Sequence, residues 1–381
     1  MRRRGSITQR SPGSWSIWID SGRDAEGKRS RKMITFRSTK VAAERELTRL
    51  LRELDTGAFV DPSKLTVGEY LEKWLAQVKP GVGGKTWERY GEIVRLHLIP
   101  ALGRIPLPKL TPTHIQDAHA RALESGRKDG KGGLSAQTVL HHHRALKEAL
   151  GNAVRLQLLA RNPAEAVDPP RPRREEMQAL DGAAAARLLA AVRDTSMNVP
   201  VVLALATGMR RGEILGLKWE DVDLDRGTLT VNRSLETTRG TLTFKGPKTQ
   251  KGRRRITLPP FAVQALIVHR ARQAEVRLLL GPAYVDQGLV LAGAEGGPMH
   301  PDSLTTGFRR LAKKAGVAGL RFHDLRHSHA SQLLEQGIPL KVVSERLRHA
   351  SVAITGDTYA HILPGMQEEA ARRIEATLGG G

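Results

Sequence analysis

Five side chains in this sequence have the types and the order that cleavage of a phosphodiester without a metal ion would need. His323 and Arg326 are three residues apart, His349 and Tyr359 follow them, and Arg210 lies more than a hundred residues upstream. Two arginines can hold one phosphate and absorb charge in its transition state. Histidines move protons near neutral pH, and a tyrosine can become covalently bonded to phosphorus. The combination predicts a tyrosine nucleophile directed at a phosphodiester.

The charge of the chain indicates a polyanionic partner. Its 381 residues include 61 Lys+Arg against 39 Asp+Glu, which gives a formal net charge of +22. A basic tail would concentrate this charge at one end, whereas here it recurs in every segment. Such a surplus is typical of proteins that bind nucleic acid. We therefore expect a nucleic-acid-binding protein and not merely a solubilising surface charge.

The lack of cysteine limits the possible catalytic chemistry, and the lack of long apolar segments limits the possible cellular location. Because there are no cysteines, thiol catalysis, disulfide bonds and any zinc site that uses cysteine are excluded. No apolar signal core follows the basic start at Met1, and the longest apolar stretch, Val199 to Ala206, is too short to span a bilayer. We expect a cytoplasmic protein with no membrane partner.

Residues 1–60 predict a small basic α+β domain. Trp15 to Ile19 and Lys32 to Phe36 have the composition of strands, and Thr39 can cap a helix that runs to about Leu54. Residues 1–50 carry thirteen Lys/Arg against five Asp/Glu. The pattern predicts a three-stranded sheet backed by one helix, suited to reading a DNA groove. The alternative is a basic appendage with no specific site.

Residues 64–165 predict an all-helical bundle. An apolar stripe with helical spacing begins at Val67, and capping residues and prolines divide the remainder. The expected helices cover about residues 67–75, 86–97 with a stop at Pro100, 113 onward, and 135–158. A linker at 166–176 follows. Its prolines make it extended, and its Arg173 and Arg174 suit a path along a phosphate backbone.

Residues 177–381 predict a mixed, mainly α-helical α/β domain. A buried helix ends at Gly208, a strand covers 227–231, and strand-like residues 241–244 and 255–258 flank a basic hairpin. Further helices are expected at about 261–280, 302–315, 323–336, 340–348 and 352–360. A tail helix follows, with a narrow apolar stripe at Met366, Ala370, Ile374 and Leu378.

Two phrases in this last segment resemble the catalytic boxes of the tyrosine recombinase (phage integrase) family. One reads Thr-Gly-Met-Arg-Arg-Gly-Glu-Ile-Leu-Gly-Leu from Thr207 to Leu217, and the other reads His-Asp-Leu-Arg-His-Ser-His-Ala-Ser from His323 to Ser331. The preceding all-helical segment is similar to the core-binding domain of the same family. The resemblance therefore covers nearly the whole chain and implies a multidomain fold with the catalytic domain last.

The resemblance implies a role for each matching residue. Arg210 directly follows Thr-Gly-Met, so Arg210 and Arg326 are the implied phosphate clamps. His323 is the implied proton carrier, and Glu213 occupies the acidic position that supports the site. Gly208 breaks the preceding helix and presents Arg210 at a helix start, which favours an anion.

A basic stretch, residues 245–255, lies between the two boxes. Six of its eleven residues are cationic, which indicates a hairpin that contacts phosphates. In the family, the catalytic lysine lies on such a hairpin just before a threonine, which implies Lys248 as the acid for the leaving 5′ oxygen. Lys245 and Lys251 are the weaker alternatives. The expected DNA contacts of this stretch are Lys245, Lys251, Arg253 and Arg254.

The segment from Leu347 to Ser351 is similar to the family's Leu-Gly-His-Ser-Ser word, with Arg348 where glycine is usual. If that position takes a positive φ, arginine there costs about 1 kcal/mol or more. The resemblance implies that His349 hydrogen-bonds the phosphate and that Tyr359, ten residues later, is the nucleophile. A free tyrosine has a pKa of about 10 and needs a base, for which His323 is implied.

Together these matches imply a phage-type integrase. Four protomers would bring two double-stranded DNA attachment sites together, and Tyr359 would form a 3′-phosphotyrosyl bond that a 5′ hydroxyl of the partner duplex then reverses. The bond energy is retained, so neither ATP nor a metal nor another cofactor is expected. The N-terminal domain would bind arm sites that flank the core. A directionality factor and a host DNA-bending protein are possible further partners, and the nucleoid of a bacterial host is the expected location.

Four alternatives remain open at this point. A chromosome-dimer resolvase of the same family would typically lack the N-terminal basic domain, whereas a conjugative-element integrase would have the same features. His323 and His327 stand at i and i+4, as in a shortened zinc-hydrolase motif, although Arg326 would place a cation beside the metal. The last alternative is a DNA-binding protein without catalysis.

Overall fold

The structure is a computed structural model that describes residues 5–23, 29–55, 65–173, 179–246, 254–349, 351–359 and 366–379. The chain forms two compact units, residues 1–174 and 175–381. Among the helices described in these ranges, none is long and apolar enough to cross a bilayer.

The N-terminal residues form a three-stranded sheet covered by one helix, as predicted. The antiparallel strands follow the order β1 (Gly5–Ser11), β2 (Ser14–Arg23) and β3 (Arg29–Arg37). Helix α1 (Lys40–Asp55) packs on β2, where Ile17 and Ile19 are almost fully buried together with Leu50 of the helix. Period-two alternation in β2 thus supplies the apolar face that the helix covers.

The second part of this unit is the predicted helical bundle. Its helices are α2 (Val67–Val78), α3 (Gly84–Ile93), α4 (Ile99–Leu102), α5 (Pro112–Ser125) and α6 (Ala136–Arg155). Thr66 and Glu69 form a capping box at the start of α2, which satisfies the free amides there. Tyr70 and Trp74 are buried, and the Tyr70 hydroxyl donates a hydrogen bond to the Ala149 carbonyl at 2.6 Å. The apolar stripe of α2 therefore faces α6.

The sequence predicts that Pro100 stops the second helix, and this prediction is wrong. The chain passes from α3 through a π-helical turn, Val94–Leu98, directly into α4. The amide of Ile99 donates to the carbonyl of Val94, and Pro100 then occupies the first turn of α4, where its missing amide is not needed. The wider turn accommodates a residue that would break a regular helix.

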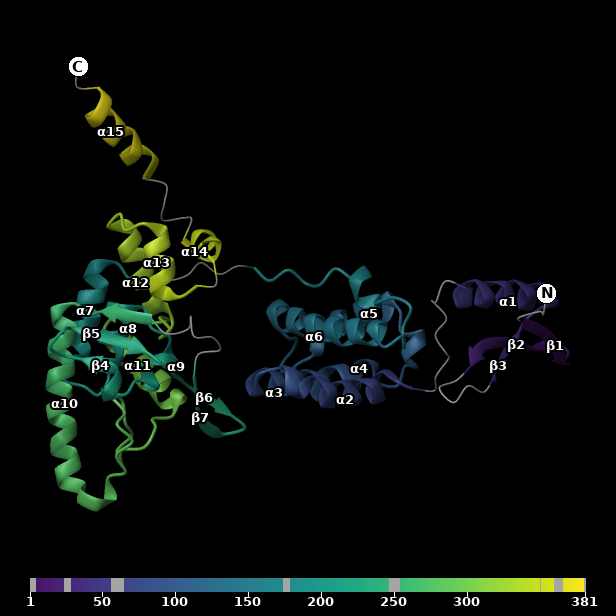
Figure 1. The fold of residues 1–381 in the computed structure, drawn as a ribbon, viewed down its shortest axis with the longest axis horizontal. Coiled ribbons are helices and arrows are strands. Elements are labelled where there is room, and N and C mark those ends of the chain that lie inside the picture. The colour runs from purple at the N-terminus through teal and green to yellow at the C-terminus, as the bar shows by residue number, and fades with distance from the viewer. Residues whose placement is uncertain are drawn as a thin grey trace. The chain divides into compact units, whose positions relative to one another are not determined.

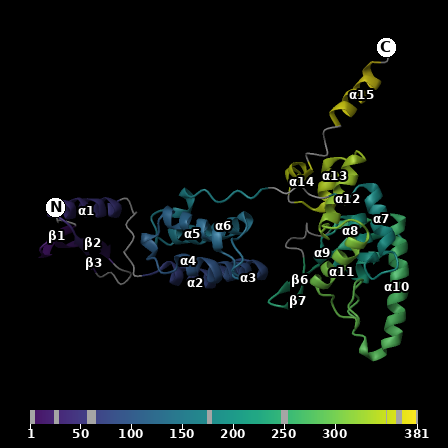
Figure 2. The same ribbon diagram turned by 180° about the vertical axis from the view of Figure 1, so that it is seen from behind.

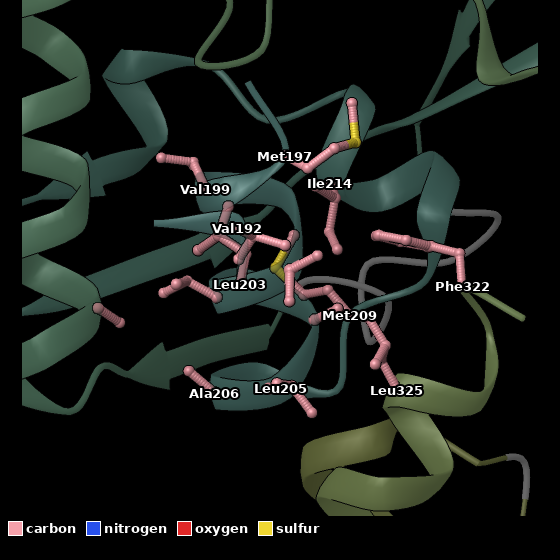
Figure 3. Packing of buried hydrophobic residues seen from close by; sticks show 14 of the residues in the cluster. Val192, Met197, Val199, Leu203, Leu205, Ala206, Met209, Ile214, Phe322 and Leu325 are labelled. Atoms are coloured by element: carbon pink, nitrogen blue, oxygen red, sulfur yellow. The ribbon is translucent and has the colours of Figure 1, made fainter. Parts of the chain in front are cut away.

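The C-terminal unit surrounds a buried apolar helix. Its helices are α7 (Gly182–Val192), α8 (Asn198–Thr207), α9 (Arg211–Leu215), α10 (Pro260–Leu280), α11 (Pro301–Lys314), α12 (Asp324–Glu335), α13 (Leu340–Leu347), α14 (Val352–Tyr359) and α15 (Met366–Leu378). Every residue of α8 from Val199 to Thr207 is buried. Figure 3 shows side chains of this helix, Leu203 among them, in one cluster with Met209 and with Leu325 of α12. This core fixes the turn after α8 relative to the start of α12.

The strands of this unit differ from the expected hairpin. β4 (Val222–Asp223), β5 (Thr228–Val231) and β8 (Arg254–Thr257) form one sheet, and β6 (Ser234–Thr238) pairs with β7 (Thr241–Lys245). The strand-like residues 241–244 and 255–258 therefore pair with different strands and not across the basic stretch, whose residues 247–253 lie outside the described ranges. The local hairpin forms because Arg239 and Gly240 both take positive φ, of 51° and 77°, as a tight two-residue turn requires.

Three helices of the C-terminal segment lie together at one end of this unit. α12 contacts α13, and α13 contacts α14, and both views show the three side by side (Figures 1 and 2). A small apolar cluster joins them, comprising Ala330, Leu334, Val343, Leu347 and Tyr359. Because α12 also packs on α8, this helix pair holds the phrase from Thr207 to Leu217 close to the phrase from His323 to Ser331.

Candidate active site

The turn after α8 presents Arg210. Gly208 ends α8 in the left-handed conformation with φ 64°, and its amide donates to the Ala204 carbonyl. A Cβ on Gly208 would lie 2.6 Å from Leu347 Cδ2 and 2.7 Å from His329 Cδ2, so both the conformation and the space require glycine. Arg210 follows in extended conformation as the N-cap of α9. The helix start anticipated from the sequence is therefore present.

Glu213 accepts hydrogen bonds from Arg210 and forms an ion pair with Arg254. Its carboxylate accepts from the Arg210 amide at 2.9 Å and from the Arg210 guanidinium at 3.1 Å. Both terminal nitrogens of Arg254 donate to it, at 3.1 and 2.6 Å. Burial alone would raise the pKa of Glu213, but the hydrogen bond and charge of Arg254, followed by Arg210, lower it to about 2. The carboxylate is thus ionised and acts as a fixed anchor for two arginines.

Arg254 does not project outward as an expected DNA contact would. Its side chain is 9% exposed, and its guanidinium is directed at Glu213. Lys245 also has an acidic partner, because its ammonium lies 2.6 Å from Glu236 on the neighbouring strand. Arg173 is exposed at the end of its described segment. Of the other predicted DNA contacts, Arg174, Lys251 and Arg253 lie outside the described residues, as does the predicted catalytic Lys248.

Arg326 is buried and ties two parts of the site together. It is 3% exposed, and its guanidinium donates to the carbonyls of Gly208 and Leu347. Burial first, and the nearby Arg210 second, lower the pKa of Arg326 to about 9, which still leaves it protonated at neutral pH. With two of its five donors on carbonyls, the guanidinium retains donors for a phosphate.

The segment after α13 holds Arg348 and His349. Arg348 has φ 56° and ψ 55°, the left-handed conformation that the usual glycine would adopt freely. Its carbonyl accepts a hydrogen bond from Arg210 at 3.3 Å, so the strained residue contacts the first box. The ring of His349 is fixed by a 2.8 Å hydrogen bond between Nδ1 and the Thr355 hydroxyl. The remaining ring nitrogen, Nε2, is the one available to a ligand.

Tyr359 ends α14 and is 1% exposed. Its hydroxyl forms a 2.8 Å hydrogen bond with Nδ1 of His327, and not with the predicted base His323. Burial raises the pKa of Tyr359 to about 12, against the opposing effect of Arg326. The hydroxyl is therefore neutral in the free protein.

The histidines near these arginines are held neutral. Desolvation, then the charges of Arg326 and Arg210, lower the pKa of His349 to about 4. Desolvation and Arg326 also lower the pKa of His323, which stands at the N-cap of α12. Arg210 and Arg326 donate to the carbonyls of Arg348 and Leu347, directly before His349, and His323 begins the helix that carries Arg326, so these two arginines and two histidines lie close together.

A histidine–arginine pair that the sequence did not single out supports the turn beneath Arg210. His329 Nδ1 lies 2.7 Å from the Leu205 carbonyl, and its Nε2 accepts from Arg346 at 3.1 Å. Arg346 also donates to the carbonyls of Ala206 and Thr257. The pair thus joins α8, α12, α13 and β8. Its only sequence signal is a histidine on the buried face of α12, three residues after Arg326.

The zinc alternative finds no support in the geometry. Across the described ranges, no group of three His, Asp or Glu side chains is arranged to hold a metal ion.

The fold and the grouped Arg, His and Tyr side chains define a class of protein that acts on phosphodiesters. Residues 173–365 match the phage integrase family, and residues 66–122 match its N-terminal SAM-like domain. The chain belongs to the phage integrase family. It is a tyrosine recombinase of the integrase type, which cleaves and rejoins DNA at specific sites.

Relatives match over almost the full length. The chain is 30% identical over 354 residues to an integrase of Streptomyces ambofaciens, covering 91% of this chain and 88% of that protein. It is 28% identical over 383 residues to a tyrosine recombinase XerC-like protein of Caldanaerobacter subterraneus subsp. tengcongensis, with 94% and 95% covered. It is 24% identical over 376 residues to the ICEBs1 integrase of Bacillus subtilis, with 98% and 100% covered.

Two solved structures have a similar fold. The Tn1549 transposon integrase in complex with a circular intermediate DNA superimposes with a TM-score of 0.67 at 21% identity, covering 81% of this chain and 99% of that one. A lambda integrase dimer bound to a core site gives a TM-score of 0.56 at 19% identity, covering 94% and 96%. The predicted fold class, with a small α+β domain, a helical domain and a mainly α catalytic domain, is confirmed.

Proposed function

We propose that this integrase joins two double-stranded attachment sites through a covalent bond between Tyr359 and DNA. Tyr359 attacks the scissile phosphate and forms a 3′-phosphotyrosyl bond, and the 5′ oxygen leaves with a proton. The 5′ hydroxyl of the partner duplex then attacks phosphorus and releases the tyrosine. Arg210 and Arg326 stabilise the charge of the pentacovalent transition state, and His349 donates a hydrogen bond to the phosphate. Lys248 is the proposed acid for the leaving oxygen.

The observation that supports this assignment is electrostatic. Arg326 influences the pKa of Tyr359, and the pKa of Arg326 responds in turn to Arg210, Glu213 and Tyr359. Tyr359 therefore lies near Arg326. Arg326 and Arg210 in turn donate to the carbonyls of the adjacent residues Leu347 and Arg348, which brings together the two guanidinium groups that a phosphate would bridge. A tyrosine that served only for packing would have no reason to lie near Arg326 and to hydrogen-bond a histidine.

The test is the covalent adduct. Tyr359→Phe removes only the hydroxyl, so we expect unchanged DNA affinity and complete loss of adduct on a nicked suicide substrate in denaturing gels. Excess chelator should leave the wild-type adduct unchanged. An undiminished adduct in Tyr359→Phe would exclude Tyr359 as the nucleophile.

The assembly is a further part of the proposal. Four protomers would hold two duplexes, and a solved structure of similar fold is a lambda integrase tetramer bound to a Holliday junction. Residues 1–60 would bind arm sites outside the crossover core, because a basic three-stranded sheet suits a groove. A directionality factor and a host bending protein would act on the same DNA. Phage and conjugative-element origins are equally compatible with the relatives.

A further inference from the structure

The Tyr359 hydroxyl has a partner that none of the assigned roles uses. His327 Nδ1 lies 2.8 Å from the hydroxyl oxygen, a strong hydrogen-bond distance. The two rings are 5.9 Å apart between centroids. His323, which the family resemblance implies as the base, instead meets the edge of the His327 ring at 5.2 Å. Among the described residues, the group that touches the reacting oxygen is therefore His327.

The position of His327 is fixed by rigid surroundings. It lies in the first turns of α12, between the fully buried Leu325 and the buried Ser328. Ser328 donates to the Asp324 carbonyl and accepts from the Leu180 amide, which ties this turn to the N-terminal end of the unit. A base held on a rigid helix keeps the hydrogen-bond geometry that proton transfer needs.

We infer that His327 is a further catalytic residue, which holds the Tyr359 hydroxyl through Nδ1 and takes its proton during attack. The inference rests on the proposed function of Tyr359. The hydroxyl donates to Nδ1, so the neutral ring carries its proton on Nε2. As the tyrosine O–P bond forms, the O–H bond breaks and the proton moves to Nδ1. The P–O5′ bond breaks, and the leaving oxygen receives its proton from the separate acid. Ligation returns the proton from Nδ1 to the tyrosine.

The charges around His327 disfavour proton transfer from Tyr359 in the free protein. Desolvation first, and then His323, lower the pKa of His327 to about 4, while the pKa of Tyr359 is raised to about 12. The other charges that face His327 are those of Asp324, Arg326 and Arg321, and Arg321 is paired with Asp324. A phosphodiester bound at Arg326 would offset the cationic charge there and raise the pKa of His327. Bound DNA would therefore make proton transfer from Tyr359 to His327 more favourable.

Two substitutions separate holding the hydroxyl from accepting its proton. His327→Ala removes both functions, whereas the amide oxygen of His327→Asn can accept a hydrogen bond near the Nδ1 position without acting as a base. General-base loss typically reduces a rate by about 10²- to 10⁴-fold. We expect both variants to lose at least about 100-fold in the rate of adduct formation on a suicide substrate, with unchanged DNA affinity and thermal unfolding. His300→Asn is the matched control, because His300 caps α11 and asparagine caps equally well.

The pH profile supplies a second readout. For the full-length wild type on saturating DNA, adduct formation should rise with pH through one histidine-like pKa, and this limb should vanish in His327→Ala. A wild-type rate in His327→Ala, or full recovery in His327→Asn, would overturn the inference. If His327→Ala is slower but its rate still rises with pH as in the wild type, the inference is overturned as well. If wild type itself forms no adduct through Tyr359, the proposed function fails, and that result is distinct from each of these.

Discussion

Acidification should unfold the helical bundle of residues 65–173 through histidines buried inside it. His119 and His142 are 8% and 4% exposed, and burial lowers the pKa of each to about 4. His97 stacks on His142 at 4.4 Å, and His143 meets His119 at 5.4 Å. Nε2 of His119 and Nδ1 of His143 are buried without a hydrogen-bond partner in the described structure. Besides burial, the pKa of His119 is lowered by His143 and that of His142 by other histidines and Arg89, so the folded state resists protonation of these rings.

The sign and size of this pH effect on the free energy of unfolding follow from proton linkage. In the unfolded chain a histidine has a pKa near 6.5, so between pH 6.5 and 4 the unfolded state binds more protons and the free energy of unfolding falls as the pH falls. At pH 5 the loss relative to pH 8 is about 2 kcal/mol for each of the two histidines, or about 4 kcal/mol together, as an upper value. That is a large fraction of the roughly 5–15 kcal/mol that stabilises a typical domain.

Urea unfolding of the full-length protein at pH 8 and pH 5 tests this reasoning. Fluorescence reports the bundle because Trp74 lies in its core. The double variant His119→Leu/His142→Leu cannot titrate at these positions and replaces a ring whose nitrogen has no partner. We expect the variant to lose about 4 kcal/mol less than wild type between the two pH values. Equal losses in both proteins would refute the assignment of the pH dependence to these rings.

Four further predictions concern the site and its accessory domain. Arg348→Gly should raise the free energy of unfolding by about 1 kcal/mol in urea denaturation, because glycine adopts φ 56° without strain; an unchanged value would mean that the arginine side chain offsets the strain. Arg254→Met should cost about 3–5 kcal/mol in the same assay by leaving the buried Glu213 carboxylate with one less cation, and a loss below about 1 kcal/mol would contradict the anchor role. Lys248→Ala should slow cleavage, and a substrate with a 5′-bridging sulfur, whose leaving group needs no proton, should restore the rate if Lys248 is the acid. Deleting residues 1–60 should spare cleavage of a short core substrate but impair recombination between full attachment sites, and equal recombination by both forms would remove the arm-binding role.

Features set by short-range patterns were predictable from the sequence. The end of α8 at Gly208 follows from an apolar run and a glycine, and the support of Arg210 by Glu213 spans only three residues. The three-stranded sheet and its helix follow from alternation and turn residues. The resemblance to the family's catalytic boxes predicted that Arg210 and Arg326 lie together, which helical or strand periodicity could not predict.

What the sequence could not predict depends on contacts between distant residues or on a single side-chain rotamer. Arg254 is 41 residues from Glu213, and in the sequence it is one of several equivalent cations. His323 and His327 lie one turn apart on α12, so only the positions of their rings decide which meets Tyr359. The sequence predicts a helix stop at Pro100 because the π turn before it has no simple sequence signal.

The charges of the site in the free protein indicate how DNA would bind to it. Arg210 and Arg254 both face one carboxylate, Glu213, and Arg326 makes its described hydrogen bonds to uncharged carbonyls. The nearby Arg210 lowers the pKa of Arg326, which means that the two guanidinium groups repel each other. An anion placed between them would relieve this repulsion, and a phosphorane, which carries more charge than a phosphodiester, would relieve it further. In the proposed mechanism, the same arrangement would therefore favour DNA binding and, more strongly, the transition state.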